Sequence, residues 1–469
     1  MEEEIGGSDA RENKPRTGGL NPGEAQSVSE IMKTGGLYIA LAVLVILGGT
    51  LYWSNHRKPA DDTSKASADT PPTILKLDQS SIEKLELKNK DADPVVLAKS
   101  SSGDWQITAP KPLRADQSAV TSVLSEVSSL NSERLVDDKA SNLAPYGLDH
   151  PAFELNLTEK NHQSQKLLIG NNTLTGSVYA ALANDPRVFA IATYTKTSLD
   201  KGLNDLRDKR LLPVNADKVS QVELMRKNQA IEFGRNKDAW QILKPKPYRA
   251  DGAQVSELLN KLTDAKMDLT GSDSNDASSA FAKAAPFATA KLTDESGTEQ
   301  LEVRKDKDTY YAKSSAVEGA HKVDADLGTA LDKGIDDFRN KKLFDFGYDD
   351  PSRIELHNGA KAYFLTRGTG GYDDWWSNGK KLDSSAETVV SDVRDLSASQ
   401  FVDSGFSNPT LELTVTSEDG KRIEKVSIAK AGDHYVAKRE NDPALYQLDS
   451  SSVDSLASAA EALKPAAAK

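Results

Sequence analysis

Residues 104–116 read DWQITAPKPLRAD, and residues 239–251 read AWQILKPKPYRAD. Trp105 and Trp240 are 135 residues apart, and so are Arg114-Ala115-Asp116 and Arg249-Ala250-Asp251. Self-similarity at a fixed spacing indicates tandem copies of one structural unit. The aspartate directly precedes an apolar helical pattern, which is the position of a helix N-cap.

Apolar residues after each tryptophan recur at helical spacing, and a third, shorter copy follows Trp375-Trp376. The predicted helix faces are Val120, Val123, Leu124, Val127 and Leu130; Val255, Leu258, Leu259 and Leu262; and Ala386, Val389, Val390, Val393 and Leu396. Runs with a period of two residues, such as Phe153, Leu155 and Leu157, predict strands between the helices. Leu199-Asp200-Lys201-Gly202 returns as Leu331-Asp332-Lys333-Gly334, which predicts an equivalent closing helix.

These patterns predict an α+β fold class with one N-terminal transmembrane helix, a flexible linker and three tandem α+β repeat units. Each unit is expected to have an antiparallel sheet with covering helices. The predicted limits are a polar disordered leader at 1–33, the transmembrane helix at 34–55, the linker at 56–73, repeat units at 74–210, 211–342 and 343–463, and a tail at 464–469.

The membrane segment is predicted from residues 34–55, which carry no charged side chain. About 20 apolar residues span the hydrocarbon layer of a bilayer. A cleaved signal peptide and a buried soluble helix are the alternatives, but the apolar run is longer than a signal-peptide core. The numbers of positive charges on the two sides of this segment are nearly equal, so the positive-inside rule does not decide the orientation. We expect a cytoplasmic N-terminus and a periplasmic body because the leader is short and the body is long.

Composition limits the possible functions. The chain has 469 residues, a formal net charge of −12 and no cysteine. A nucleic-acid partner is not expected, because phosphate binding needs a basic surface. Thiol catalysis, disulfides and thiolate metal sites are excluded.

Four stretches resemble one bacterial family, domain of unknown function 4340. They are the Trp-x-Ile segments, Tyr146-Gly147-Leu148-Asp149-His150-Pro151, Leu167-Leu168-Ile169-Gly170 and the segment from Leu206 to Leu212. The resemblance covers nearly everything after residue 73 and fades in the third unit. It implies an N-terminal anchor and an envelope role beside an ABC transporter of the gliding-motility type, and it supplies no catalytic residue.

Most of the short motifs that could indicate catalysis or ligand binding have a structural explanation. None of the six histidines forms a zinc motif, so each is expected on the surface or in a loop. Ser81-Ile82-Glu83-Lys84 matches the Ser-x-x-Lys of penicillin-binding enzymes, but its alternation suggests a strand. Gly368-Thr369-Gly370-Gly371 is expected to be a hairpin turn, and Asp273-Ser274-Asn275-Asp276 the tip of a linker.

For the tryptophans and for two basic stretches, a functional interpretation remains open beside the structural one. The tryptophans are expected in the core, but they could line a sugar or lipid groove. The basic stretches Arg207–Arg210 and Arg339–Lys342 are expected to complement a helix dipole, but they could contact a partner.

The predicted function is that of a non-catalytic envelope protein, anchored in the inner membrane as an accessory or scaffold subunit of an ABC-transporter-type system. The expected partners are the membrane and transporter subunits, and the oligomeric state is left open. No catalytic, cofactor-binding or metal-binding residue is predicted. A ligand- or lipid-binding module and an envelope hydrolase are the alternatives.

Overall fold

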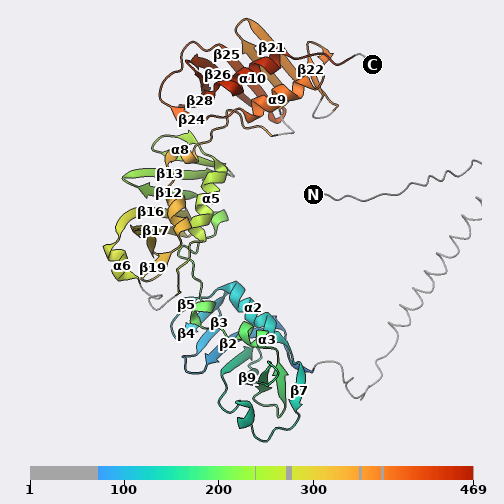
Figure 1. Cartoon of the computed structure of the whole chain (residues 1–469), viewed down its shortest axis with the longest axis vertical. Coiled ribbons are helices and arrows are strands. Elements are labelled where there is room, and N and C mark those ends of the chain that lie inside the picture. Colours follow the sequence, from blue (N-terminus) through green and yellow to red (C-terminus); the bar gives the residue numbers. More distant parts are fainter. Residues whose placement is uncertain (1–71, 238, 271–276, 348–350, 371–373, 468–469) are drawn as a thin grey trace, which may run out of the picture. The chain divides into compact units, whose positions relative to one another are not determined.

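A computed structural model describes residues 72–237, 239–270, 277–347, 351–370 and 374–467 (Figure 1). The predicted leader, the predicted transmembrane helix and residues 56–71 of the predicted linker lie outside the described residues. Repeats 1, 2 and 3 denote residues 74–210, 211–342 and 343–463, whose limits remain predictions.

The predicted fold class is wrong. Of the described residues, 44% are in strands and 23% in helices, and the strands form four antiparallel sheets. The reason is that the half of each repeat before its main helix also forms a meander of four strands, whereas the helices have only 4–12 residues. Among the described residues, no helix has the length and apolar character needed to cross a membrane.

Repeat 1 has a nine-stranded antiparallel sheet in the order β5-β4-β3-β2-β8-β9-β10-β11-β7, and a separate pair of strands, β1 and β6. Its strands are β1 Thr73–Lys76, β2 Ile82–Asn89, β3 Val95–Lys99, β4 Trp105–Ala109, β5 Leu113–Arg114, β6 Ser129–Asn131, β7 Arg134–Asp137, β8 Phe153–Glu159, β9 Ser164–Asn172, β10 Val178–Leu182 and β11 Val188–Ile191. Its helices are α2 Gln117–Ser128, α3 Thr193–Leu199 and α4 Leu203–Leu206.

Repeat 2 has an eight-stranded sheet in the order β15-β14-β13-β12-β16-β17-β18-β19. Its strands are β12 Gln221–Arg226, β13 Gln229–Asn236, β14 Ala239–Lys244, β15 Tyr248–Arg249, β16 Ala285–Asp294, β17 Gly297–Asp306, β18 Thr309–Ser314 and β19 Ala320–Val323. Its helices are α5 Gly252–Thr263, α6 Ser278–Lys283, α7 Ala325–Leu331 and α8 Ile335–Phe338.

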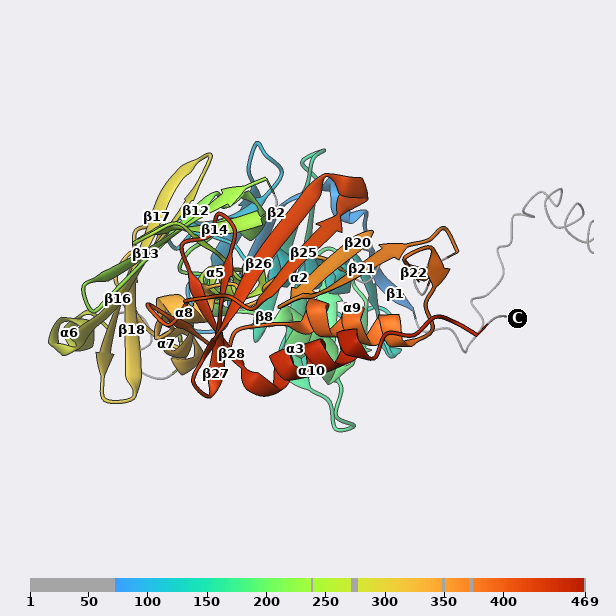
Figure 2. The same cartoon turned by 90° about the horizontal axis from the view of Figure 1, so that it is seen from above.

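Repeat 3 has a nine-stranded sheet in the order β23-β22-β21-β20-β25-β26-β27-β28-β24. Its strands are β20 Arg353–Asn358, β21 Lys361–Arg367, β22 Trp375–Ser377, β23 Lys380–Lys381, β24 Gln400–Val402, β25 Leu411–Ser417, β26 Arg422–Ala431, β27 His434–Arg439 and β28 Leu445–Asp449. Its helices are α9 Ser385–Asp395 and α10 Ser450–Glu461, which lie side by side on the sheet in Figure 2.

The three sheets share the order of eight strands, and the sheets of repeats 1 and 3 have a ninth strand, β7 or β24, at one edge. In each repeat a four-stranded meander leads into a helix, a second meander follows, and the first strands of the two meanders pair at the centre (β2 with β8, β12 with β16, β20 with β25). The predicted faces of α2, α5 and α9 are buried in the cores of their own repeats. The predicted N-caps are confirmed, because Asp116 and Asp251 each accept two backbone N–H bonds from the first turn.

Candidate functional site

Five histidines lie among the described residues, and His56 lies outside them. His150, His162 and His357 are exposed, and His434 is half-buried beside Asp433. His321 is different: it lies in β19 and only 2% of it is exposed. The predicted surface or loop position is therefore wrong for His321, because its side chain points to the covered side of an edge strand.

Alanine in place of any one of the six histidines is expected to leave function in the cell intact, since no histidine belongs to a recognisable site. For His321→Ala we also expect some loss of stability, because the ring is buried. Complementation of a deletion strain, with protein level measured in parallel, is the test. Loss of function at a normal protein level would contradict the non-enzymatic interpretation.

The other motif matches do not assemble a reactive centre. No group of three or more His, Asp or Glu in the described part of the chain is placed to hold a metal ion. Ser81 precedes β2, and its hydroxyl donates to Glu159 Oε1 at 2.7 Å, while Lys84 lies on the strand itself, as the alternation predicted. A Ser-x-x-Lys site needs both side chains on one helix face, which this strand does not provide.

The glycine-rich segment lies between β21 and β22, where a hairpin turn is predicted; Gly371 and the predicted linker tip at 273–276 lie outside the described residues. The Gly370 N–H donates to Asp374 Oδ2 at 2.8 Å. A Cβ at Gly368 would lie 2.2 Å from that oxygen. Glycine at position 368 is therefore explained by its close packing against the Asp374 carboxylate, without assuming a phosphate-binding loop.

The tryptophans are core residues, as predicted. Trp105, Trp240 and Trp375 are 6%, 5% and 1% exposed, whereas Trp376 is 40% exposed. Each buried ring is covered by a cation on the neighbouring strand: Lys99 at 5.3 Å, Arg235 at 4.9 Å and Arg367 at 5.2 Å from the ring centre. Trp240 also lines the cleft between repeats 2 and 3, although only 5% of it is exposed.

The two basic stretches connect successive repeats, a role that the sequence did not suggest. The backbone of Arg207 forms an isolated β-bridge with that of Ala115 in repeat 1. Three residues later, the backbone of Arg210 forms a β-bridge with that of Lys266 in repeat 2. The next connector repeats this arrangement, with Arg339 opposite Ala250 and Lys342 opposite Ser397. Each connector therefore pairs its backbone with both of the repeats that it joins.

The repeated arginine also reaches across each junction. Arg114 donates to Arg210 O at 2.8 Å and to Ala316 O of repeat 2 at 3.1 Å. Its equivalent, Arg249, donates to Lys342 O at 2.7 Å and pairs with Asp345 of repeat 3. A single repeated residue thus contacts both the connector and the following repeat.

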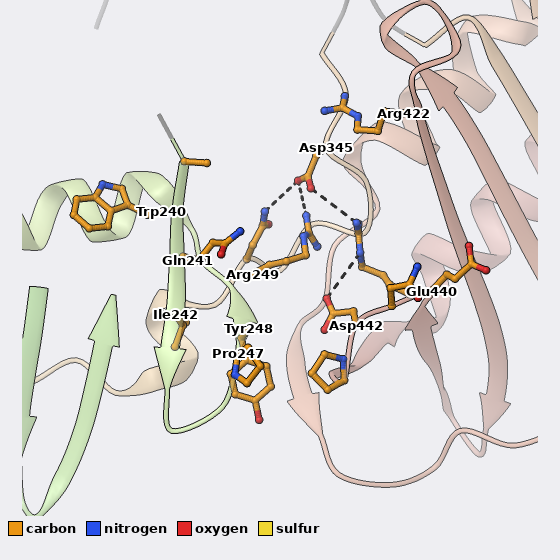
Figure 3. A pocket seen from close by; sticks show the side chains of 16 residues that line it. Trp240, Gln241, Ile242, Pro247, Tyr248, Arg249, Asp345, Arg422, Glu440 and Asp442 are labelled. Carbon is orange, nitrogen blue, oxygen red and sulfur yellow. Dashed lines mark hydrogen bonds and ion pairs between the residues drawn. The ribbon is translucent and has the colours of Figure 1, made fainter. Parts of the chain in front are cut away.

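The junction of repeats 2 and 3 contains a cleft with a volume of about 580 Å³. Figure 3 shows Arg249 extending from repeat 2 towards Asp345, with Trp240 and Ile242 on the neighbouring strand. The charged lining residues are three arginines and three acids: Arg249, Arg422, Arg439, Asp345, Glu440 and Asp442. Since the charges balance, the cleft has no net preference for an anion or a cation.

Most of this charge is already paired within the protein. Arg439 lies 2.9 Å from Glu424 and 3.9 Å from Asp442, and both acids are less than 9% exposed. Burial, together with the hydrogen bond that Tyr446 donates to Asp442 at 2.7 Å, raises the pKa of Tyr446 to about 12. Arg249 of repeat 2 joins this network through Asp345 and, at 3.5 Å, through the hydroxyl of Tyr446. The network therefore stabilises repeat 3 and its contact with repeat 2.

Comparison with known proteins identifies the family. Residues 105–277 and 240–409 each match the family model described as Domain of unknown function (DUF4340), and together the two matches span about two thirds of the chain. The chain belongs to the DUF4340 family. Both DUF4340 matches begin at an equivalent buried tryptophan, which confirms that the domain is repeated. Comparisons with curated proteins and with solved structures gave no match.

Two of the DUF4340 motifs contact each other in repeat 1. A Cβ at Gly170 would lie 2.3 Å from the carbonyl oxygen of Tyr146, and Gly147 has a φ of +66°. Leu148 and Leu168, from the same two motifs, pack in a small cluster on the outer face of the sheet. These motif residues therefore have a structural role, which is to fasten a loop to the sheet.

Proposed function

We propose that this chain is a non-catalytic, membrane-attached envelope protein that serves as an accessory or scaffold subunit of an ABC-transporter-type system. The supporting observation is the construction of the junctions, in which a connector strand pairs with both repeats and one arginine crosses each joint. A repeat array held in this way presents successive surfaces in a fixed order, which suits binding to a large partner.

Purification of the full chain from native membranes tests this role. We expect the membrane and ATP-hydrolysing subunits of one transporter to co-purify in a fixed ratio that survives a second affinity step. A full chain that purifies alone, both directly and after cross-linking in intact cells, would contradict the scaffold role.

The proposal places the body in the periplasm, attached to the inner membrane through the apolar residues 34–55. A reporter that is active only in the periplasm is expected to be active when fused after Lys469. Activity of a cytoplasm-only reporter at the same position would reverse the orientation. Appearance of the body in the soluble fraction would show cleavage instead of attachment.

A ligand-binding role is a second candidate, favoured by the cleft between repeats 2 and 3. Its volume of about 580 Å³ lies within the range of small-molecule sites, and Tyr248 and Pro247 supply apolar lining. Native mass spectrometry of the purified full chain would reveal a bound lipid or sugar. Loss of that mass in Tyr248→Ala, with retention in Tyr435→Ala outside the cleft, would support this role over the scaffold.

A further inference from the structure

The exposed tip of repeat 1 is uncharged and carries a leucine, whereas the equivalent tips of repeats 2 and 3 each contain a charged residue. The β9–β10 hairpin has the tip Thr173–Ser177, and Leu174 at its centre is fully exposed. The equivalent hairpins of repeats 2 and 3 turn through Lys307-Asp308 and Gly432-Asp433. Repeat 1 therefore has a longer tip that carries a leucine.

A second exposed position differs in the same direction. Tyr194, in the first turn of α3, is 72% exposed. It lies five residues before the buried Leu199, and the residues five before the equivalent Leu331 and Leu456 are Asp326 and Ser451. At both exposed positions, therefore, repeat 1 has an apolar or aromatic residue, whereas the equivalent positions of repeats 2 and 3 have glycine or polar residues.

These two side chains belong to one rigid surface, because hydrogen bonds hold the tip. Thr173 is buried, and its hydroxyl accepts the N–H of Ser177 at 3.0 Å and that of Thr175 at 3.3 Å. The hydroxyl of Thr193, next to Tyr194, donates to the carbonyl oxygen of Gly176. The tip that carries Leu174 is therefore hydrogen-bonded to the first turn of α3, which carries Tyr194.

The same surface is uncharged over a long stretch of sequence. Residues 167–184 and 188–195 contain no Asp, Glu, Lys or Arg, in a chain in which 28% of residues are charged. These two segments themselves bring no charge into contact with an apolar phase, although the exposed Glu133 lies beside the tip, where it accepts a hydrogen bond from Ser177.

The chain also enters repeat 1 at this end. Pro72 O accepts two hydrogen bonds from Ser132, through N at 2.9 Å and Oγ at 2.8 Å. The next residue, Glu133, accepts a hydrogen bond from Ser177 of the tip. Residues 56–71, between the apolar segment and Pro72, span at most about 55 Å when fully extended, which limits how far Pro72 can lie from the membrane to which we propose the chain is attached.

We propose that the tip of repeat 1, through Leu174 and Tyr194, inserts into the lipid bilayer surface, so that repeat 1 is the membrane-contacting repeat. Leucine enters the acyl boundary, and tyrosine is suited to the headgroup level because its ring is apolar and its hydroxyl polar. This inference rests on the proposed membrane attachment.

Because the chain has no cysteine, one introduced thiol can be labelled selectively. An environment-sensitive fluorophore is placed at Asn172→Cys, an exposed residue beside the tip, in the full chain reconstituted into phosphatidylethanolamine–phosphatidylglycerol vesicles. Asp308→Cys, at the equivalent hairpin of repeat 2, is the matched control. We expect emission at shorter wavelength and quenching by lipid-borne quenchers for the label at 172 but not at 308.

Two further measurements separate the possible outcomes. Leu174→Ser/Tyr194→Ser in the Asn172→Cys chain is expected to abolish the shift while the chain still floats with the vesicles. If the label at 172 stays in an aqueous environment while the chain floats with the vesicles, the inference is wrong and membrane attachment stands. If the shift appears only when a partner protein is present, the tip contacts that protein and not the lipid bilayer. A chain that does not float overturns both proposals.

Discussion

Trp375→Ala is expected to lower the free energy of unfolding by about 3–5 kcal/mol, because it removes a large, fully buried aromatic side chain and leaves a cavity. Trp375 is 1% exposed and belongs to the core of repeat 3. A loss of that size is a large part of the roughly 5–15 kcal/mol that stabilises an ordinary domain. Hydrogen exchange resolved by peptide is the suitable measurement, since a chain of three repeats need not unfold in one step.

The neighbouring tryptophan provides a matched control. Trp376 is 40% exposed, and its indole N–H donates to Asp374 at 2.9 Å. Trp376→Ala is therefore expected to cost about 1 kcal/mol or less. Equal losses for the two variants would show that burial of the ring at 375 is not what stabilises repeat 3.

The burial of the tryptophans could be predicted because their signal is local and repeated. A helix face or strand face leaves a regular pattern over about ten residues, and equivalent positions in three copies support one another. The same reasoning correctly placed the aspartate N-caps at Asp116 and Asp251. It underestimated the strand content, because it did not resolve the four-stranded meander before each main helix, whose last strands β5, β15 and β23 have only two residues and leave no period.

The junctions could not be predicted in this way. Arg249 and Tyr446 lie within 3.5 Å of each other but are 197 residues apart in sequence. Polar pairs of this kind follow no period, and the basic connectors have the composition of an ordinary exposed helix end. One signal was available: pairs of large apolar residues open each repeat, at Ile74-Leu75, Leu211-Leu212 and Leu343-Phe344, and all six are buried.

Arg439→Ala is expected to destabilise repeat 3 and its junction with repeat 2 by about 3–5 kcal/mol, because it leaves Glu424 buried without its main partner. The arginine side chain is 11% exposed and the Glu424 side chain 6%, and the two lie 2.9 Å apart. Arg439 also donates to the carbonyl oxygen of Leu343, the residue directly after the connector, so faster hydrogen exchange is expected both there and in β27. Lys425→Ala is the control, because Lys425 lies next to Glu424 in β26 and pairs at 3.8 Å with Glu440, the residue after Arg439, with both side chains more than half exposed. Such surface pairs contribute about 0–1 kcal/mol.

Arg439→Met/Glu424→Leu removes both charges and should recover much of the lost stability, since apolar residues of similar volume often replace a buried ion pair at little cost. If the double variant is no more stable than Arg439→Ala, the loss comes from the bond to Leu343 and from packing, and the buried charge is not its cause.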